Sequence, residues 1–298
     1  MAIKLKLPPP IPPNGAPAAP PAAFQTGETA IYRCKWGAMM VNRHDSAIGR
    51  ALAVYGEFAE SENLLMARFL RPGDVAVDIG ANVGSVALCL AKTVGPGGTV
   101  HAFEPQRQIF QYLSGNAGLN GYTNLRCINA AVGAENGTIA LPPVDYGKPR
   151  NFGAVSLATP VGDNGEKAEI RTLDSLDLES CRLIKIDVEG MEPAVLEGAE
   201  KTINRLRPVV YTENKKNGNS PKIIRFFQER RYRLYWHFAR FFQEDNFNGV
   251  SNNVFGNRGD INMLCVPPNM GGKLALPPVS GPDADWRADS EEWKARTK

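Results

Sequence analysis

The stretch VAVDIGANVG, residues 75–84, decides the fold. It opens with a short run rich in Val, which is typical of a buried strand, and the run closes on Asp78 and Gly80. The following residues, GSVALCLAKT (84–93), have the pattern of a helix. Gly80 and Gly84 in the turn let the backbone pass close to a ligand. The helix that follows presents its free N–H groups to that ligand.

Strand-like and helix-like stretches alternate through the rest of the central sequence. Further strands are predicted at 99–105, 124–133, 182–190, 208–214, 232–238 and 261–267, and further helices at 106–118, 192–206 and 221–231. Apolar strands separated by helices indicate a parallel sheet covered on both faces. The sequence therefore predicts a doubly wound α/β domain.

Composition shifts divide the 298 residues into three parts. Residues 1–27 are rich in Pro and Ala and are expected to form a flexible leader. Residues 28–267 form the predicted domain, in which 28–70 is an N-terminal helix or lid and 134–178 is an insertion rich in turn residues. Residues 268–298 form a Pro- and Gly-rich tail.

Composition also excludes several classes of protein. A net charge of +3 is too small for a protein built to coat nucleic acid or anionic lipid. The five cysteines are far apart and form no CxxC pair, which favours free thiols in a reducing compartment. Neither a membrane span nor a secretory leader is expected, so we predict a cytoplasmic protein and leave its oligomeric state open.

The first two strands end in carboxylates that suit a particular ligand. Asp78 lies directly at the glycine turn, where it would repel a pyrophosphate and attract an amino group. Glu104 ends the second strand and can accept both hydroxyls of a ribose. These two carboxylates predict S-adenosylmethionine. The alternatives are a nucleotide-binding domain and a purely structural α/β domain.

At this point the sequence resembles the FkbM-type S-adenosylmethionine-dependent methyltransferases. The resembling segments are YGEFAESE (55–62), PGDVAVDIGANVGSVAL (72–88), GTVHAFEPQRQIFQYL (98–113), NAAVG (129–133), NFGAVSL (151–157), LIKIDVEGMEPAVLEGA (183–199), RPVV (207–210) and NMLCVP (262–267). The resemblance implies a class I methyltransferase fold, with a seven-stranded sheet whose last strand is antiparallel. It also implies methyl transfer to a hydroxyl of a sugar, a glycoconjugate or a natural product.

Cofactor-binding residues follow from the resemblance, position by position. Asp78, Gly80, Asn82 and Gly84 would line the methionine moiety, Glu104 would hold the ribose, and Pro105, Gln106, Asn129, Ala130 and Ala131 would border the adenine. Asp187 ends the fourth strand and is placed beside the cofactor as well. The turn that contains Tyr55 and Glu57 is expected to touch the methionine carboxylate or the acceptor.

Three charged residues alternate along the end of the fourth strand. Regular strand geometry would put Lys185, Asp187 and Glu189 on one face, either as a structural ion pair or as catalytic groups. Asp187 is the first candidate for the base or for a metal ligand, because it lies at the carboxyl end of the strand. His237 follows an aromatic strand and is a second candidate base.

A magnesium site is a further hypothesis. Asp187 after the fourth strand, with Glu213 and Asn214 after the fifth, is similar to the ligand arrangement of catechol O-methyltransferases. Such oxygen ligands suit Mg²⁺. This chain has Glu213 where that arrangement has Asp. Without a metal, a carboxylate or a histidine must take the proton from the acceptor.

The expected partner is a small-molecule or glycan hydroxyl acceptor, with no nucleic acid and no membrane span. Aromatic residues are frequent between 226 and 247, and Trp236 is the candidate platform for a sugar. An RNA or protein methyltransferase on the same fold is one alternative, and a non-catalytic cofactor-binding module is another. The small net charge and the lack of an NPPY motif at the fourth strand argue against the first alternative.

Overall fold

The computed structural model describes residues 20–156, 165–215, 218–272 and 274–297. Its central feature is a seven-stranded sheet in the order β12-β13-β11-β10-β4-β5-β6. The strands are β4 (Val75–Ile79), β5 (Thr99–Phe103), β6 (Leu125–Ile128), β10 (Leu183–Ile186), β11 (Val209–Glu213), β12 (Arg233–Arg240) and β13 (Gly259–Val266). Strands β11, β10, β4, β5 and β6 are parallel, whereas β13 runs antiparallel to both β11 and β12. The fold class predicted from the sequence, a doubly wound sheet with an antiparallel last strand, is confirmed.

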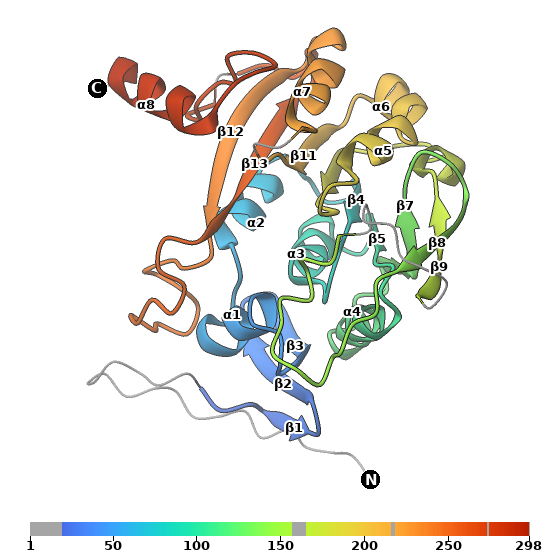
Figure 1. The fold of residues 1–298 in the computed structure, drawn as a ribbon, viewed down its shortest axis with the longest axis vertical. Coiled ribbons are helices and arrows are strands. Elements are labelled where there is room, and N and C mark those ends of the chain that lie inside the picture. Colours follow the sequence, from blue (N-terminus) through green and yellow to red (C-terminus); the bar gives the residue numbers. More distant parts are fainter. Residues whose placement is uncertain (1–19, 157–164, 216–217, 273, 298) are drawn as a thin grey trace.

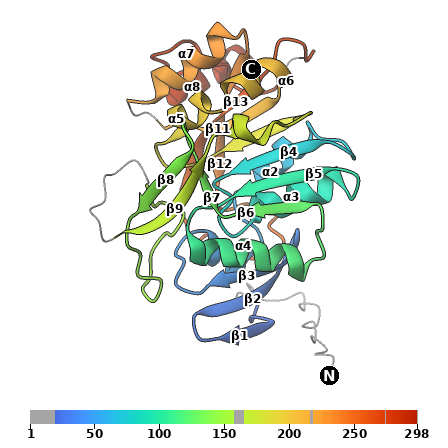
Figure 2. The ribbon, with the colours of Figure 1, turned by 90° about the vertical axis from the view of Figure 1, so that its right-hand side faces the viewer.

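Helices cover both faces of this sheet (Figure 2). The helices of one face include α3 (Ser85–Val94) and α4 (Arg107–Leu119), and those of the other include α5 (Glu192–Glu197), α6 (Glu200–Leu206) and α7 (Ser220–Glu229). Ala76 and Val77 are neighbours in β4, yet they belong to different buried clusters, because successive side chains of a strand point to opposite faces. Burial on both faces explains why the strands read as continuous apolar runs.

Two predicted elements are divided in the structure. The strand predicted at 124–133 ends at Ile128 and resumes as β7 (Ala130–Val132) in a different sheet. The side chain of Asn129 donates to the carbonyl oxygens of Glu104 and Pro105, which fixes the bend between the two strands. The helix predicted at 192–206 divides between α5 and α6 around Gly198, whose missing side chain lets it approach the carbonyl oxygen of Gly133.

The segment before the central sheet is more than a helical lid. It forms an antiparallel sheet of β1 (Phe24–Thr26), β2 (Thr29–Cys34) and β3 (Gly37–Asn42), followed by α1 (Ile48–Tyr55) and α2 (Glu60–Ala67). Strand β1 falls within the stretch predicted as a leader, of which residues 1–19 lie outside the described residues. The helix α2 packs on α3 and on β12, so it covers the edge of the sheet where the ligand is expected.

The stretch predicted as an insertion adds β8 (Gly137–Leu141), β9 (Glu166–Arg171) and a short 3₁₀ helix (Leu173–Leu176). Strands β8 and β9 join β7 in a second three-stranded sheet beside the central one (Figure 1). Residues 157–164 of this stretch lie outside the described residues.

The C-terminal segment returns to the central sheet and ends in α8 (Trp286–Thr297), beside β12 and β13 (Figure 1). The ring of Trp286 stacks on Phe238 of β12 at 5.0 Å between centroids and an angle of 15°. The indole N–H of Trp236 donates to Asp289 over 2.7 Å. Residues that follow the predicted domain therefore complete one wall of it.

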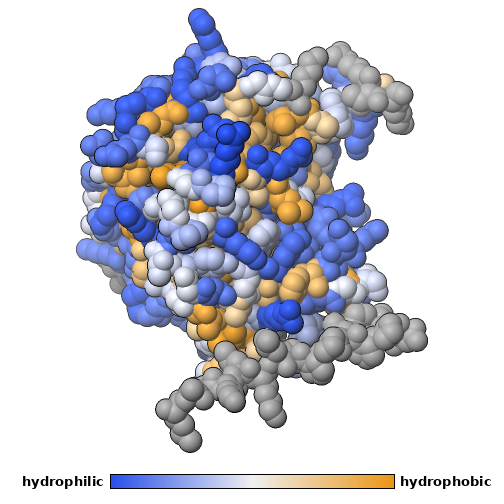
Figure 3. Space-filling model, turned by 180° about the vertical axis from the view of Figure 1, so that it is seen from behind, coloured by the Kyte–Doolittle hydropathy of each residue, from blue (hydrophilic) through white to orange (hydrophobic). Residues whose placement is uncertain are grey.

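Hydrophilic residues surround small groups of hydrophobic ones on the face shown in Figure 3, which is typical of a surface in contact with water. Among the described residues, none of the helices is long and apolar enough to cross a membrane.

Candidate active site

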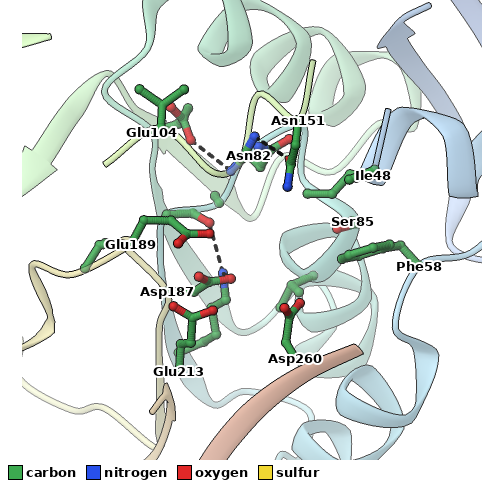
Figure 4. Close-up of a pocket in the computed structure, with 18 of the residues that line it drawn as sticks. Ile48, Phe58, Asn82, Ser85, Glu104, Asn151, Asp187, Glu189, Glu213 and Asp260 are labelled. Atoms are coloured by element: carbon green, nitrogen blue, oxygen red, sulfur yellow. Dashed lines mark hydrogen bonds and ion pairs between the residues drawn. The ribbon is translucent and has the colours of Figure 1, made fainter. Parts of the chain in front are cut away.

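A cavity lies where the strands β4, β5, β10 and β11 end (Figure 4). Its volume is about 100 Å³, and it is partly open to solvent. Its wall is made by Ala47, Ile48, Phe58, Glu62, Gly80, Ala81, Asn82, Ser85, Val86, Glu104, Pro105, Gln106, Asn151, Gly153, Val155, Lys185, Asp187, Val188, Glu189, Glu213, Phe241 and Asp260. The cavity therefore occupies the edge at which open α/β sheets bind their ligands.

Gly80 begins the turn between β4 and α3. Its φ of 79° is in the left-handed region, and a Cβ added there would lie 1.9 Å from the carbonyl oxygen of Asp187. Any side chain at this position would push the ends of β4 and β10 apart. The glycine thus permits the close approach of two strand ends, and the chain reaches Asn82 and the start of α3 directly beside the cavity.

Glu104 is held by backbone donors on two sides. Its Oε2 accepts from the N–H of Asn82 at 3.0 Å, and its Oε1 accepts from the N–H of Gln106 at 2.9 Å. Burial raises the pKa of this carboxyl to about 7. We call the surface formed by Gly80, Asn82, Glu104 and Gln106 the glycine-loop wall.

Lys185 connects β4 and β10 beneath the cavity. Its ammonium lies 3.4 Å from Asp78 and 3.4 Å from Asp187, and it donates to the carbonyl oxygen of Gly80 at 2.9 Å. Asp78 is fully buried, whereas 40% of the Asp187 side chain is exposed. The lysine therefore neutralises a carboxylate in the core and positions another one at the cavity.

A second group of carboxylates faces the glycine-loop wall across the cavity (Figure 4). Carboxylate oxygens of Asp187, Glu189 and Glu213 lie within 4.8 Å of one another, and the Lys215 ammonium pairs with Glu189 and Glu213. Burial, together with the charge of Asp187, raises the pKa of Glu213 to about 9 and that of Asp260 to about 7. We call Asp187, Glu189, Glu213 and Asp260 the carboxylate wall.

The cavity as a whole is acidic. Its described lining residues carry the carboxyl groups of Glu62, Glu104, Asp187, Glu189, Glu213 and Asp260, against the single ammonium of Lys185. Such a surface attracts a cationic ligand and repels phosphate groups.

A second cavity opens beside the carboxylate wall. It shares the lining residues Asn151, Glu189, Phe241 and Asp260 with the first cavity, so the two lie side by side. Its other lining residues include the stacked rings of Phe238 and Trp286 and the guanidinium groups of Arg258 and Arg287. This outer cavity offers flat aromatic faces and hydrogen-bond donors next to the carboxylates.

Half of the residues predicted for the site do line the first cavity. These are Gly80, Asn82, Glu104, Pro105, Gln106, Lys185, Asp187, Glu189 and Glu213. They come from three loops that follow parallel strands and from β10 and β11, which explains why strand-end reasoning identified them.

Other predicted residues lie behind the cavity wall. Asp78 faces Lys185 in the core, and Gly84 packs its backbone against Leu88 and Leu113 at the start of α3. The side chain of Asn129 donates a hydrogen bond to the carbonyl oxygen of Glu104 after β5, and Ala130 and Ala131 are buried in β7.

The predicted turn before α2 is also turned away from the cavity. The Tyr55 hydroxyl donates to the carbonyl oxygen of Asn252 and accepts from the N–H of Val254. Glu57 accepts from the N–H of Phe247 and pairs with Lys35 at 3.6 Å. Both side chains fasten the N-terminal segment to the loop between β12 and β13.

Two further predictions, for His237 and Trp236, are corrected by the structure. His237 lies in β12 outside the cavity, where its Nδ1 and the Tyr211 hydroxyl are 2.7 Å apart and burial lowers its pKa to about 4. Asn214 donates from its amide nitrogen to the sulfur of Met263, while its Oδ1 has no hydrogen-bond partner among the described residues, so its role as a metal ligand stays a prediction. Trp236 is 3% exposed and cannot serve as a sugar platform, whereas Trp286 lines the outer cavity.

Sequence reasoning missed Glu62, Ser85, Phe58, Phe241 and Asp260, which all line the first cavity. The signal for Asp260 was present, because it begins the antiparallel last strand, and the start of such a strand lies at the carboxyl edge of its parallel neighbours. Glu62 lies in the YGEFAESE segment but five residues beyond Glu57.

The sequence of the chain also matches a known protein family. The family model of the methyltransferase FkbM domain matches residues 78–234, which is more than half of the chain. The chain belongs to the FkbM methyltransferase family. This confirms the predicted family, whose model describes a methyltransferase domain.

Individual relatives are more distant or match over a short segment. The 31-O-demethyl-FK506 methyltransferase FkbM of Streptomyces tacrolimicus is 54% identical over 48 residues, which span 16% of this chain and 18% of that protein. A crystal structure of methyltransferase FkbM from Methylobacillus flagellatus is 15% identical with a TM-score of 0.45, covering 69% of this chain and 50% of that chain. TYW2 of M. jannaschii, solved in complex with AdoMet, is 14% identical with a TM-score of 0.44, covering 81% and 87%. This degree of similarity is too low to transfer site residues to this chain.

Proposed function

We propose that this FkbM-family protein transfers a methyl group from S-adenosylmethionine to a hydroxyl of a sugar, a glycoconjugate or a natural product. The observation that carries the proposal is the acidic cavity at the strand ends, with a hydrogen-bonded carboxylate on one side and carboxyls of raised pKa on the other. A cation fits this charge, and the remaining carboxyls can orient a hydroxyl and take its proton.

The glycine-loop wall is the proposed binding surface for the nucleoside. Glu104 is fixed by two backbone donors, and the outer lone pairs of its oxygens remain able to accept the hydroxyls of a ribose. Gln106 is fixed beside it, since its side-chain amide donates to the carbonyl oxygen of Phe152. Both residues are therefore arranged before the ligand arrives, which limits the entropy lost on binding.

The carboxylate wall is the proposed surface for the acceptor. S-adenosylmethionine, when bound, supplies a methyl group that is already activated by the neighbouring sulfonium. The protein must then align an acceptor oxygen and receive its proton. Asp187 is held in place by Lys185 and would accept a hydrogen bond from the hydroxyl, and Asp260, whose pKa is about 7, would take the proton as the carbon–oxygen bond forms.

The outer cavity is the proposed entrance for the rest of the acceptor. The rings of Trp286 and Phe238 stack on each other, and their remaining apolar surface would contact a sugar ring, while the amide of Asn151 and the guanidinium of Arg258 can donate to its hydroxyls. A polynucleotide fits less well, because its phosphates would have to pass the acidic wall around Glu189 and Asp260.

Magnesium is the alternative activator. Asp187, Glu189 and Glu213 offer oxygen ligands, but the Lys215 ammonium already pairs with two of them. A divalent cation would have to displace Lys215, so we favour a carboxylate base over a metal.

The proposal is tested by calorimetry with S-adenosylmethionine, followed by a screen of methyl transfer to sugar and natural-product hydroxyls with and without EDTA. We expect binding, transfer to a hydroxyl, and no effect of EDTA. Failure to bind the nucleoside would contradict the proposal, and loss of transfer in EDTA would move the chemistry to the metal.

The proton step has its own test. Asp260→Asn is expected to lower turnover by about 10²–10⁴-fold without loss of nucleoside affinity, because the amide cannot accept the proton. In the wild type, turnover should rise as the pH increases through about 7, the pKa of Asp260, because only the ionised carboxylate is a base. The exposed Asp283→Asn is the matched control, and turnover unchanged in Asp260→Asn would remove this residue from the mechanism.

A further inference from the structure

Glu62 is a buried carboxyl of the cavity that neither the sequence analysis nor the proposed proton transfer uses. It lies in the first turn of α2, is 7% exposed and lines the first cavity. Its neighbours along the cavity are Lys185, Asp187 and Asp260, each of which interacts with it electrostatically.

No hydrogen bond or ion pair joins the side chain of Glu62 to another described residue, and Lys185 is the cation that acts on it most strongly. Glu60, two residues earlier in the same helix, pairs with Lys35 at 3.1 Å and accepts from Trp36 and Asn63. Glu104, although equally buried, accepts from two backbone N–H groups. Glu62 is thus a buried carboxyl at the wall of a cavity, and none of the described residues donates a hydrogen bond to it.

Such an arrangement is unfavourable in the ligand-free protein. The Glu62 carboxyl has lost most of its hydration, because the residue is 7% exposed and meets solvent only through the cavity, and burial raises its pKa well above the ordinary value. The favourable field at the start of α2 stabilises a carboxylate at the protein surface as well and does not require burial. A ligand with a cationic hydrogen-bond donor would supply the missing partner.

The position of Glu62 along the sheet edge indicates which cation this is. Glu104 follows β5, the glycine turn follows β4, and Asp187 follows β10. A nucleoside whose ribose meets Glu104 therefore directs its amino-acid end toward β4 and β10, where Glu62 lies beside Lys185 and Asp187. Asp78, which the sequence analysis assigned to this end, is already paired with Lys185 in the core.

We propose that the Glu62 carboxylate binds the α-ammonium group at the methionine end of S-adenosylmethionine. The inference rests on the proposed function, because it requires the nucleoside to occupy this cavity. An ammonium has three N–H donors and can satisfy a buried carboxylate directly, whereas a sulfonium has none. Glu62 is therefore a cofactor-binding residue contributed by the N-terminal segment, outside residues 78–234 of the family match.

Calorimetry with three related nucleosides tests this assignment. S-adenosylmethionine carries the sulfonium and the ammonium, S-adenosylhomocysteine carries only the ammonium, and 5′-methylthioadenosine carries neither. We expect Glu62→Gln to weaken the first two ligands by the same factor, about 10- to 100-fold, which is the effect of a lost hydrogen bond to a charged group. The affinity for 5′-methylthioadenosine should not change.

The control is Glu60→Gln, which removes a buried carboxylate of the same helix that points away from the cavity. It should lower thermal stability and leave all three affinities unchanged. Glu62→Gln should instead raise the melting temperature of the ligand-free protein, because it removes a buried carboxyl that lacks a partner.

The outcomes separate this inference from the proposed function. Equal affinities of Glu62→Gln and the wild type for S-adenosylhomocysteine would overturn the role of Glu62 and leave the nucleoside site intact. A loss confined to S-adenosylmethionine would place the carboxylate at the sulfonium instead and would also overturn the assignment. A wild type that binds none of the three nucleosides would overturn the proposed function itself.

Discussion

The glycine-loop wall and the carboxylate wall of the cavity differ in what satisfies their polar groups. On the glycine-loop wall, the backbone N–H groups of Asn82 and Gln106, in the turns after β4 and β5, hold Glu104, and the turn at Gly80 follows from backbone geometry. On the carboxylate wall, side chains from β10, β11 and β13 lie close together, and their mutual repulsion is offset by Lys185 and Lys215.

Because of this difference, one wall is suited to recognise a nucleoside and the other to exchange protons. On the glycine-loop wall, backbone donors from the two turns after β4 and β5 hold Glu104 in place, which suits this wall to a constant ligand such as a nucleoside. On the carboxylate wall, burial and the repulsion between neighbouring carboxyls raise the pKa of Asp260 to about 7 and that of Glu213 to about 9, so Asp260 is suited to exchange a proton with an acceptor near neutral pH.

The largest effect is expected where the two walls share a support. Lys185→Met leaves Asp78 buried without a counter-charge and should reduce the free energy of unfolding by about 3–5 kcal/mol. The pKa of Asp78 is already raised by burial and should rise further in this variant. The folded state then binds more protons than the unfolded state, so the deficit should shrink as the pH falls from 8 toward 5.

Urea denaturation of Lys185→Met at several pH values measures this effect. Lys222→Met, an exposed substitution in α7, is the matched control and should change little. An equally small effect of both substitutions would mean that Asp78 does not depend on Lys185.

A smaller effect is expected from the turn of the glycine-loop wall. Gly80→Ala places a Cβ 1.9 Å from the carbonyl oxygen of Asp187 at a φ of 79°. We expect a loss of about 2–4 kcal/mol of stability and no detectable binding of S-adenosylhomocysteine in calorimetry. Gly97→Ala, where a Cβ would meet no atom within 4 Å, should be neutral. Normal binding in Gly80→Ala would show that the strand ends can separate freely.

Substitution of the carboxylate on the glycine-loop wall should affect binding rather than folding. Glu104→Gln weakens the hydrogen bonds proposed for the ribose and is expected to reduce the affinity for S-adenosylhomocysteine by about 1–3 kcal/mol. Calorimetry measures this change, with the exposed Glu179→Gln as control. An unchanged affinity would place the ribose elsewhere in the cavity.

The smallest effect is expected at a residue that the structure removes from the site. His237→Gln breaks the contact with the Tyr211 hydroxyl and should cost about 1 kcal/mol of stability. Turnover measured at pH 7 should stay within about twofold of the wild type, because His237 does not line the cavity. A loss comparable with that of Asp260→Asn would return the histidine to the mechanism.

The two walls were also predictable from sequence to different degrees. Gly80, Asn82 and Glu104 belong to short motifs at the ends of β4 and β5. The turn after each strand fixes both the path of the chain and the position of the site residues. The alternation of apolar strands and helices likewise predicted the sheet, because a strand that is buried on both faces is a run of consecutive apolar residues.

Side chains that meet only through tertiary packing were not predictable in this way. Asp260 and Glu62 reach the cavity from β13 and α2, which are close to opposite ends of the domain's sequence. Asp78 and His237 have the right residue types at strand positions near the site, but Lys185 and Tyr211 engage them outside the cavity. Residue type and strand position do not specify which neighbour a side chain will contact.

A crystal structure of the protein with S-adenosylhomocysteine would test the division of the cavity most directly. We predict the ribose hydroxyls within hydrogen-bond distance of Glu104 and the sulfur directed toward the carboxylate wall around Asp187 and Asp260. A nucleoside bound outside this cavity, or one whose adenine occupies the carboxylate wall, would contradict the account.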